Sequence, residues 1–171
     1  YCDDGTNSKA CKKPVTTLPN ALKDLLVTHN IGGVILFSEN IKTNKQLIAW
    51  QPDLIVLAGF MRVLSGSFID NVPAPMINLH PSLLPVYKGL DTHKRVIQAG
   101  ERRHGCSIHK VTAELDAGQV LTQAVLSVDI NDTVESLQSR VQKLEHQLLP
   151  WTILLLAKNA LSVETNNTSS E

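Results

Sequence analysis

The sequence contains few cysteines, no excess of charge of either sign and no long hydrophobic run. Its three cysteines, Cys2, Cys11 and Cys106, match neither zinc-ligand spacing nor a disulfide framework, so we expect a reducing, cytoplasmic location. Sixteen basic residues balance sixteen acidic ones, whereas nucleic-acid binding needs an excess of Lys and Arg. Without a long apolar stretch or a basic and apolar leader, we expect neither a membrane span nor a signal peptide.

The chain has enough apolar residues to bury one core, at 43% of 171 residues, so a single domain is expected. Residues 1–50 are expected to form an atypical N-terminal segment, with a polar lead-in followed by a helix, a strand and another helix. Residues 51–160 are expected to form the core that carries the functional site. Residues 161–171 are expected to be a polar tail.

Short runs of bulky apolar residues alternate with helical patterns along the chain. This alternation predicts an α/β fold with a mostly parallel sheet and flanking helices. Strands are predicted at residues 34–37, 54–58, 75–79, 107–111 and 120–128. Helices are predicted at residues 20–26, 40–50 and 94–99, and over a longer segment near the end of the sequence.

The longer C-terminal helix is predicted from apolar residues at helical spacing, which mark its buried face. These residues are Leu137, Val141, Leu144 and Leu148. The helix is expected to begin at Asp132 or Thr133. Glu135 is expected to pair with Asp132 in an arrangement like a capping box. Pro150 is expected to interrupt the helix, which then continues over residues 151–160 as an apolar segment.

Asn78 and His80 end a predicted strand, at the edge of the sheet where α/β folds bind ligands. Residues two apart in a strand point to the same side, so this carboxamide and imidazole would share one face. An amide N–H beside an imidazole suits an oxygen that gains negative charge, and the imidazole can transfer protons near neutral pH. The spacing alone also fits a polar strand end that is hydrogen-bonded locally.

Asp116 lies close to Gly118 in a turn-rich segment between two predicted strands. A carboxylate in a loop usually forms a turn or caps a helix. Near His80, however, it would favour the imidazolium and order a water molecule between the two side chains. Both interpretations remain open from the sequence.

Gln138, Gln142 and Glu145 fall at helical spacing beside the stripe of apolar residues in the C-terminal helix. One interpretation is a solvated helix face. The other is a polar edge that binds the ammonium or hydroxyl groups of a ligand.

Cys106 has a histidine on each side, His104 and His109, but the spacing differs from that of zinc sites. No metal site is therefore predicted. His109 is expected to point to the same strand face as Ser107.

Residues 52–157 resemble the glycinamide ribonucleotide formyltransferases, the folate-dependent enzymes of purine synthesis. The resemblance is carried by six ordered motifs, among them Ile-Asn-Leu-His-Pro-Ser-Leu-Leu-Pro ending at Pro85 and Glu-Leu-Asp-Ala-Gly ending at Gly118. The motifs lie at residues 53–64, 77–85, 87–93, 104–109, 114–118 and 139–146. The resemblance implies a Rossmann-like formyltransferase fold.

The resemblance also implies a reaction, in which a formyl group passes from 10-formyltetrahydrofolate, a co-substrate, to the amine of glycinamide ribonucleotide without a metal. The implied partners are small molecules, a reduced folate and a phosphorylated ribonucleotide, with no nucleic acid and no membrane, and the oligomeric state is left open. The implied catalytic residues are Asn78, which binds the formyl oxygen, and His80 with Asp116, which relay a proton. The implied folate-binding residues are Met61, Arg62, Val63, Leu64, Asn78, Thr112, Ala113, Glu114, Leu115 and Asp116. The implied ribonucleotide-binding residues are Gly59, Met61, Pro81, Gln142, Lys143, Leu144 and Glu145.

The N-terminal residues depart from this family, which begins with a strand and a loop that binds the ribonucleotide phosphate at a helix N-terminus. The nearest match, Gly5 to Ser8, follows no apolar strand. Residues 31–47 instead resemble a piece of a family 3 glycoside hydrolase, yet no pair of carboxylates is arranged for glycoside hydrolysis. We therefore expect weak ribonucleotide binding, and the alternative function is a folate-binding remnant or chimera without turnover.

Overall fold

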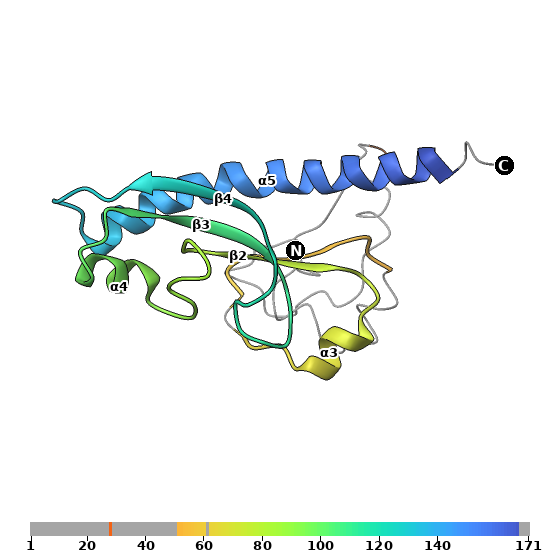
Figure 1. Cartoon of the computed structure of the whole chain (residues 1–171), viewed down its shortest axis with the longest axis horizontal. Coiled ribbons are helices and arrows are strands. Elements are labelled where there is room, and N and C mark those ends of the chain that lie inside the picture. Colours follow the sequence, from red (N-terminus) through yellow and green to blue (C-terminus); the bar gives the residue numbers. More distant parts are fainter. Residues whose placement is uncertain (1–27, 29–50, 61, 168–171) are drawn as a thin grey trace, which may run out of the picture. The chain divides into compact units, whose positions relative to one another are not determined.

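The computed structural model describes residue 28, residues 51–60 and residues 62–167, with side chains described as far as residue 158 (Figure 1). The chain divides into two compact units, Tyr1–Pro52 and Asp53–Glu171, and the strands and helices named below all belong to the second. The helices and the strand predicted before residue 51 lie outside the described residues. The proposed division into an N-terminal segment, a core and a tail stays a prediction.

The described strands form one sheet in the order β1-β2-β3-β4. Their bounds are β1 Ile55–Leu57, β2 Met76–His80, β3 Arg103–Lys110 and β4 Val120–Ser127. β1 and β2 are parallel, but β2 with β3 and β3 with β4 are antiparallel. The α/β fold is confirmed, whereas this part of the sheet is mixed rather than mostly parallel. A parallel pair needs a crossover of a dozen or more residues, and the link from Val111 to Gln119 is too short for one.

The helices of this unit are α3 (Gly66–Asn71), α4 (Thr92–Gln98) and α5 (Val134–Asn167). α3 is absent from the predicted elements. Its N-cap is Ser65, whose hydroxyl accepts a hydrogen bond from the Phe68 amide at 3.2 Å. Figure 1 shows α5 running along one side of the sheet, with α3 on the other side.

α5 begins where the sequence predicts, but a different residue completes its cap. The Thr133 hydroxyl accepts from the Ser136 amide at 3.2 Å, and the Ser136 hydroxyl accepts from the Thr133 amide at 2.9 Å. This is a reciprocal capping box with Thr133 as N-cap. The predicted pair of Asp132 with Glu135 is therefore wrong, because Asp132 instead bonds to Ser136 and Arg140.

Pro150 does not interrupt α5, contrary to the expectation from its chemistry. A proline removes one backbone donor from a helix. The residues around it pack against the core, including the buried Leu148 and the partly buried Leu149 and Ile153, so tertiary packing keeps the helix continuous. The helix extends to Asn167 and so includes part of the segment expected to be a polar tail. In the described part of the chain, no helix has the length and apolar character needed to cross a bilayer.

The main core lies between the sheet and the helices α4 and α5. The sequence prediction for α5 is confirmed, since Leu137 and Val141 are 0% exposed, Leu148 is 9% exposed and Leu144 packs beside them. A second cluster lies under α3. The buried members of the main core are Ile77, Val96, Cys106, Ile108, Leu137, Val141 and Leu148, and those of the second cluster are Val72, Ala74 and Met76.

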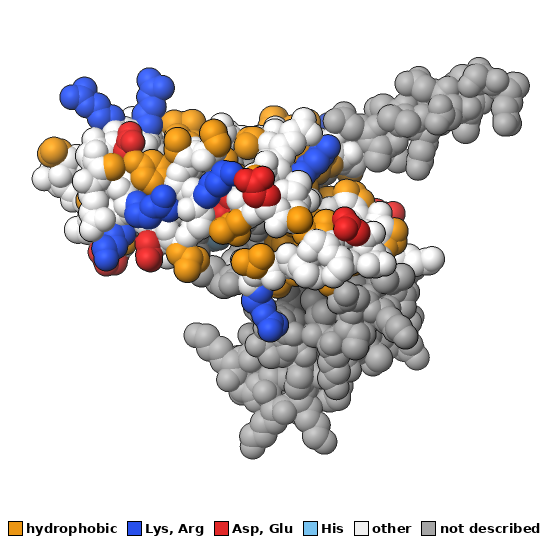
Figure 2. Space-filling model, turned by 60° about the horizontal axis from the view of Figure 1, so that its bottom comes forward, with side chains coloured by type: hydrophobic (Ala, Val, Ile, Leu, Met, Phe, Trp, Pro, Cys, Tyr) orange, Lys and Arg blue, Asp and Glu red, His pale blue; other side chains and the backbone are white. Residues whose placement is uncertain are grey.

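The surface in Figure 2 carries Lys and Arg side chains interspersed with Asp and Glu, without a gathering of either sign on the face shown. This distribution follows from the equal numbers of basic and acidic residues in the sequence. It supports the expectation that nucleic acid is not a partner, which stays a prediction.

His104 of β3 is buried at 1% exposure and faces His93 of α4, with His104 Nε2 and His93 Nδ1 3.0 Å apart. Burial, with smaller effects of the nearby His93 and His80, lowers the pKa of His104 from 6.5 to about 4. A depressed histidine pKa means that the unfolded chain binds the proton more tightly than the folded chain. The contribution of His104 to the free energy of unfolding is therefore fully present above pH 6.5 and is lost as the pH falls toward 4.

We expect the free energy of unfolding to fall by up to about 3 kcal/mol between pH 6.5 and pH 4 because of His104. His104→Gln should make this pH dependence shallower, as measured by urea unfolding at a series of pH values. His146→Gln, at an exposed histidine of α5, is the matched control and should keep the wild-type slope. An unchanged slope in His104→Gln would contradict the role of His104.

Candidate active site

The carboxyl end of β2 separates two pockets, because successive residues of a strand point to opposite faces of the sheet. Asn78 lines the pocket on one face, and Leu79 lines the pocket on the other. The sequence rule that ligands bind beyond the carboxyl ends of strands is therefore matched by the geometry.

The pocket on the Asn78 face encloses a cavity volume of about 70 Å³. Every predicted folate-binding residue that the structure describes lines it, and Met61 lies outside the described residues. These residues are Arg62, Val63, Leu64, Asn78, Thr112, Ala113, Glu114, Leu115 and Asp116. Further lining residues, which the sequence did not single out, are Leu57, Phe60, His109 and Val111.

The pocket on the Leu79 face, with a cavity volume of about 160 Å³, contains four of the predicted ribonucleotide-binding residues. These are Gly59, Pro81, Gln142 and Glu145, and they are joined by Leu79, His93 and Gln138. Gln138, Gln142 and Glu145 thus line a pocket, and Gln138 and Gln142 remain exposed to solvent. Lys143 and Leu144 do not line it, because the helical rotation turns Lys143 to solvent and packs Leu144 against the core.

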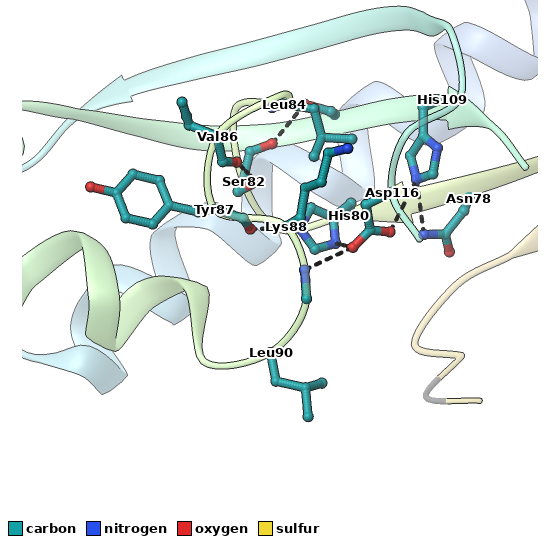
Figure 3. Close-up of polar contacts among 12 residues, drawn as sticks. Asn78, His80, Ser82, Leu84, Val86, Tyr87, Lys88, Leu90, His109 and Asp116 are labelled. Atoms are coloured by element: carbon teal, nitrogen blue, oxygen red, sulfur yellow. Dashed lines mark hydrogen bonds and ion pairs between the residues drawn. The ribbon is translucent and has the colours of Figure 1, made fainter. Parts of the chain in front are cut away.

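Asp116 lies between two imidazoles (Figure 3). Its Oδ2 is 3.4 Å from His80 Nδ1, and its Oδ1 is 3.6 Å from His109 Nε2. The Gly89 amide donates to Oδ2 at 2.9 Å, which holds the carboxylate in this orientation. Asp116 itself has a left-handed backbone, with φ of 47°, a conformation that aspartate tolerates better than most residues. Asn78, His80 and Asp116, distant in sequence, therefore gather at one place.

His80 is 5% exposed and uses both ring nitrogens. Its Nε2 is 3.0 Å from the carbonyl oxygen of Tyr87, which can only accept, so Nε2 carries a proton. Its Nδ1 faces the carboxylate of Asp116. A proton on Nδ1 would thus point to the negative charge of this carboxylate.

His109 is the functional residue that sequence reasoning missed. It pairs with Asn78 across β2 and β3, and Ser107 pairs with His80, which confirms that His109 and Ser107 share a face. His109 Nδ1 donates to the Lys110 carbonyl at 2.9 Å, so in the neutral ring Nε2 accepts from Asn78 Nδ2 at 3.2 Å. Burial lowers the pKa of His109, which favours this neutral form despite the opposing effects of the Lys110 carbonyl and Asp116.

The hydrogen bond from Asn78 to His109 sets the orientation of the carboxamide. Asn78 Nδ2 carries two hydrogens, so one bond to His109 leaves a second N–H to donate. Only the register between β2 and β3 reveals this pair, because the two residues are 31 positions apart.

Glu145 is the acidic group of the second pocket. Burial raises the pKa of its carboxyl, and the neighbouring His146 and His80 oppose that shift. A half-buried carboxylate at this position gains from a cationic or amine ligand, which would compensate for its lost hydration.

Comparisons with known proteins agree with this geometry. Residues 36–153 match the family model described as formyl transferase. The chain is 43% identical over 117 residues to phosphoribosylglycinamide formyltransferase of Escherichia coli, covering 68% of this chain and 55% of that protein. It is 47% identical over 120 residues to the trifunctional purine biosynthetic protein adenosine-3 of Gallus gallus, covering 70% of this chain and 12% of that protein.

Solved structures give the same result. Glycinamide ribonucleotide transformylase 1 of Symbiobacterium toebii superposes with a TM-score of 0.65 at 38% identity, covering 68% of this chain and 55% of that one. Phosphoribosylglycinamide formyltransferase of Bacillus halodurans superposes with a TM-score of 0.65 at 29% identity, covering 88% and 84%. The chain spans about half the length of the E. coli relative. On this match of sequence and fold, the chain belongs to the formyl transferase family.

Proposed function

We propose that this protein transfers a formyl group from 10-formyltetrahydrofolate to the amine of glycinamide ribonucleotide. The observation that carries the proposal is the meeting of Asn78, His80 and Asp116 at the strand end that separates the two pockets. Family membership supports the reaction type, and the similarity to phosphoribosylglycinamide formyltransferases supports the acceptor.

The two pockets suit the two substrates. The pocket beside Asn78 is lined by apolar side chains and by the loop of residues 112–116, an environment that fits the flat pterin of a folate. The pocket beside Leu79 presents the carboxyl of Glu145 and the amides of Gln138 and Gln142, which fit the amine and hydroxyl groups of a ribonucleotide.

The chemistry follows from the side chains between the pockets. The amine nitrogen forms a bond to the formyl carbon, and the bond from that carbon to N10 of the folate breaks. Asn78 would donate its second N–H to the formyl oxygen while that oxygen carries negative charge. One proton leaves the amine and one reaches N10, with His80 and Asp116 as the groups that carry it.

Burial strengthens these interactions. His80 and Asp116 are 5% and 9% exposed, so water screens their mutual attraction little. The imidazolium of His80 beside this carboxylate would lie close to the developing negative charge and stabilise it. No metal is needed for these steps, and the absence of a metal from the reaction stays a prediction, as does a cytoplasmic location.

The test is to mix the chain with 10-formyltetrahydrofolate and glycinamide ribonucleotide and to follow deformylation of the folate by absorbance. Deformylation should require the ribonucleotide and should be about 10²-fold slower or more in His80→Ala. A reaction without the ribonucleotide would indicate hydrolysis rather than transfer. Folate binding without deformylation would contradict the proposal and would support a binding remnant. The weak ribonucleotide binding expected from the N-terminal sequence stays a prediction that titration can check.

A further inference from the structure

We propose that Arg95 of α4 is a positioning residue for the active site, because it fixes the loop whose backbone holds His80 and Asp116. The loop runs from Tyr87 to Leu90 and is called here the 87–90 loop. The proposal rests on the proposed function, since it assigns Arg95 a part in the same reaction. Arg95 itself is exposed, and within the described residues it makes no hydrogen bond or ion pair with Asn78, His80 or Asp116.

The 87–90 loop faces the active site through alternate residues. The carbonyl of Tyr87 accepts from His80 Nε2 at 3.0 Å, and the amide of Gly89 donates to Asp116 Oδ2 at 2.9 Å. Two backbone groups of this loop thus orient the imidazole and the carboxylate from the side opposite to the sheet (Figure 3).

The carbonyls of Lys88 and Leu90, the other two residues of the loop, point to Arg95. Its Nη1 donates to the Lys88 carbonyl at 2.6 Å and to the Leu90 carbonyl at 3.3 Å. Because peptide groups are planar, holding these two carbonyls also limits the rotation of the Gly89 amide between them. One cation therefore restrains the backbone that contacts both catalytic side chains.

The backbone of this loop needs such restraint. Tyr87 has φ of 56° and Gly89 has φ of 78°, and Asp91, just after the loop, has φ of 55°. The left-handed conformation is unfavourable for tyrosine, so it persists only where surrounding contacts over-determine it. Hydrogen bonds from a guanidinium are among the stronger contacts available to a carbonyl.

Arg95 is itself held in place. Its guanidinium carbon lies 5.3 Å from the centre of the Tyr87 ring, and the Tyr87 hydroxyl donates to Glu101 at 2.8 Å. The helix that carries Arg95 is anchored by the buried Thr92 and Val96. The planar guanidinium can stack on a ring and bond to carbonyls at once, whereas a lysine ammonium lacks the flat face.

Loss of Arg95 should release the loop without removing any group that touches a substrate. We expect Arg95→Ala to lower kcat by about tenfold, the order that partial loss of orientation produces, while KM for each substrate stays within about twofold. Arg95→Lys should fall between Arg95→Ala and the wild type. Steady-state kinetics with each substrate varied in turn measures this split.

Arg140→Ala is the matched control. Arg140 of α5 also donates to a main-chain carbonyl at 2.6 Å, that of Ser127, and lies away from the 87–90 loop. This variant should lose stability but keep kcat. Equal kcat losses in the two arginine variants would indicate a general loss of stability and would overturn the proposal.

A measurement that needs no turnover separates this proposal from the proposed function. In Arg95→Ala, amide hydrogen exchange at Gly89 should accelerate about tenfold or more, and the NMR signal of the His80 ring should shift, as its bond to Tyr87 weakens. Gly89 protection and a His80 signal like those of the wild type would overturn the proposal even if the enzyme were active. If the wild type transferred no formyl group, only the proposed function would fail.

Discussion

Asp116→Asn is expected to lower the rate of formyl transfer by about 10²- to 10⁴-fold, the usual contribution of a positioned acid–base group. Asparagine keeps the shape of the side chain but removes the negative charge that faces His80 Nδ1 at 3.4 Å. The imidazolium then loses its partner, and the proton route between the attacking amine and the folate nitrogen is interrupted. The measurement is kcat at saturating concentrations of both substrates.

Asp70→Asn provides the control for this substitution. Asp70 is an exposed carboxylate in α3, and its replacement should leave the rate within about twofold and the stability nearly unchanged. Unfolding curves of both variants check that a lost rate does not reflect a lost fold. An Asp116→Asn enzyme with a rate near that of the wild type would show that the carboxylate is not part of the proton route.

Gly105→Ala is expected to lower the free energy of unfolding by about 2–4 kcal/mol, because the new methyl group has no room. A Cβ at Gly105 would overlap the carbonyl oxygen of Ala124 and lie 3.0 Å from Leu83 Cδ2. The overlap is with backbone, which cannot rotate away as a side chain can. Urea unfolding of the variant and the wild type measures the difference.

The position of Gly105 explains why the strand cannot relax easily. It lies within the paired region of β3 and β4, opposite Val125, so a shift of its backbone would break hydrogen bonds of the β3–β4 ladder. Gly66→Ala is the matched control, since its Cβ would meet only Ala113 Cβ at an ordinary 3.5 Å. Equal stabilities of the two variants would contradict the steric argument.

Local patterns allowed several features to be predicted correctly. Helical spacing identified the buried face of α5, and the two-residue spacing in β2 placed Asn78 and His80 on one face. These predictions succeeded because periodicity within one element depends on backbone geometry alone. The order of the motifs identified the family, and with it the loop of residues 112–116 that lines the first pocket.

Other local patterns were overruled by packing. Pro150 predicts a break in the helix. The stabilisation from burying its neighbours in α5 outweighs the loss of the one backbone hydrogen bond that the proline removes. Lys143 and Leu144 adjoin Glu145 in sequence but point elsewhere, because each helical step rotates the side chain by about 100°. The short link between β3 and β4 excludes a parallel pairing of these two strands, whatever their apolar content, and this contributes to the mixed sheet in the described part of the chain.

By itself, the amino-acid order determined the family and the α/β class, since motifs and periodicity depend on local sequence; the catalytic roles of Asn78, His80 and Asp116 stay predictions. Only the tertiary structure decided that His109 orients Asn78, and that Tyr87 and Gly89 hold His80 and Asp116. The reason is physical: these contacts join residues from separate strands and loops. Their distances depend on strand register and loop conformation, which no local pattern specifies.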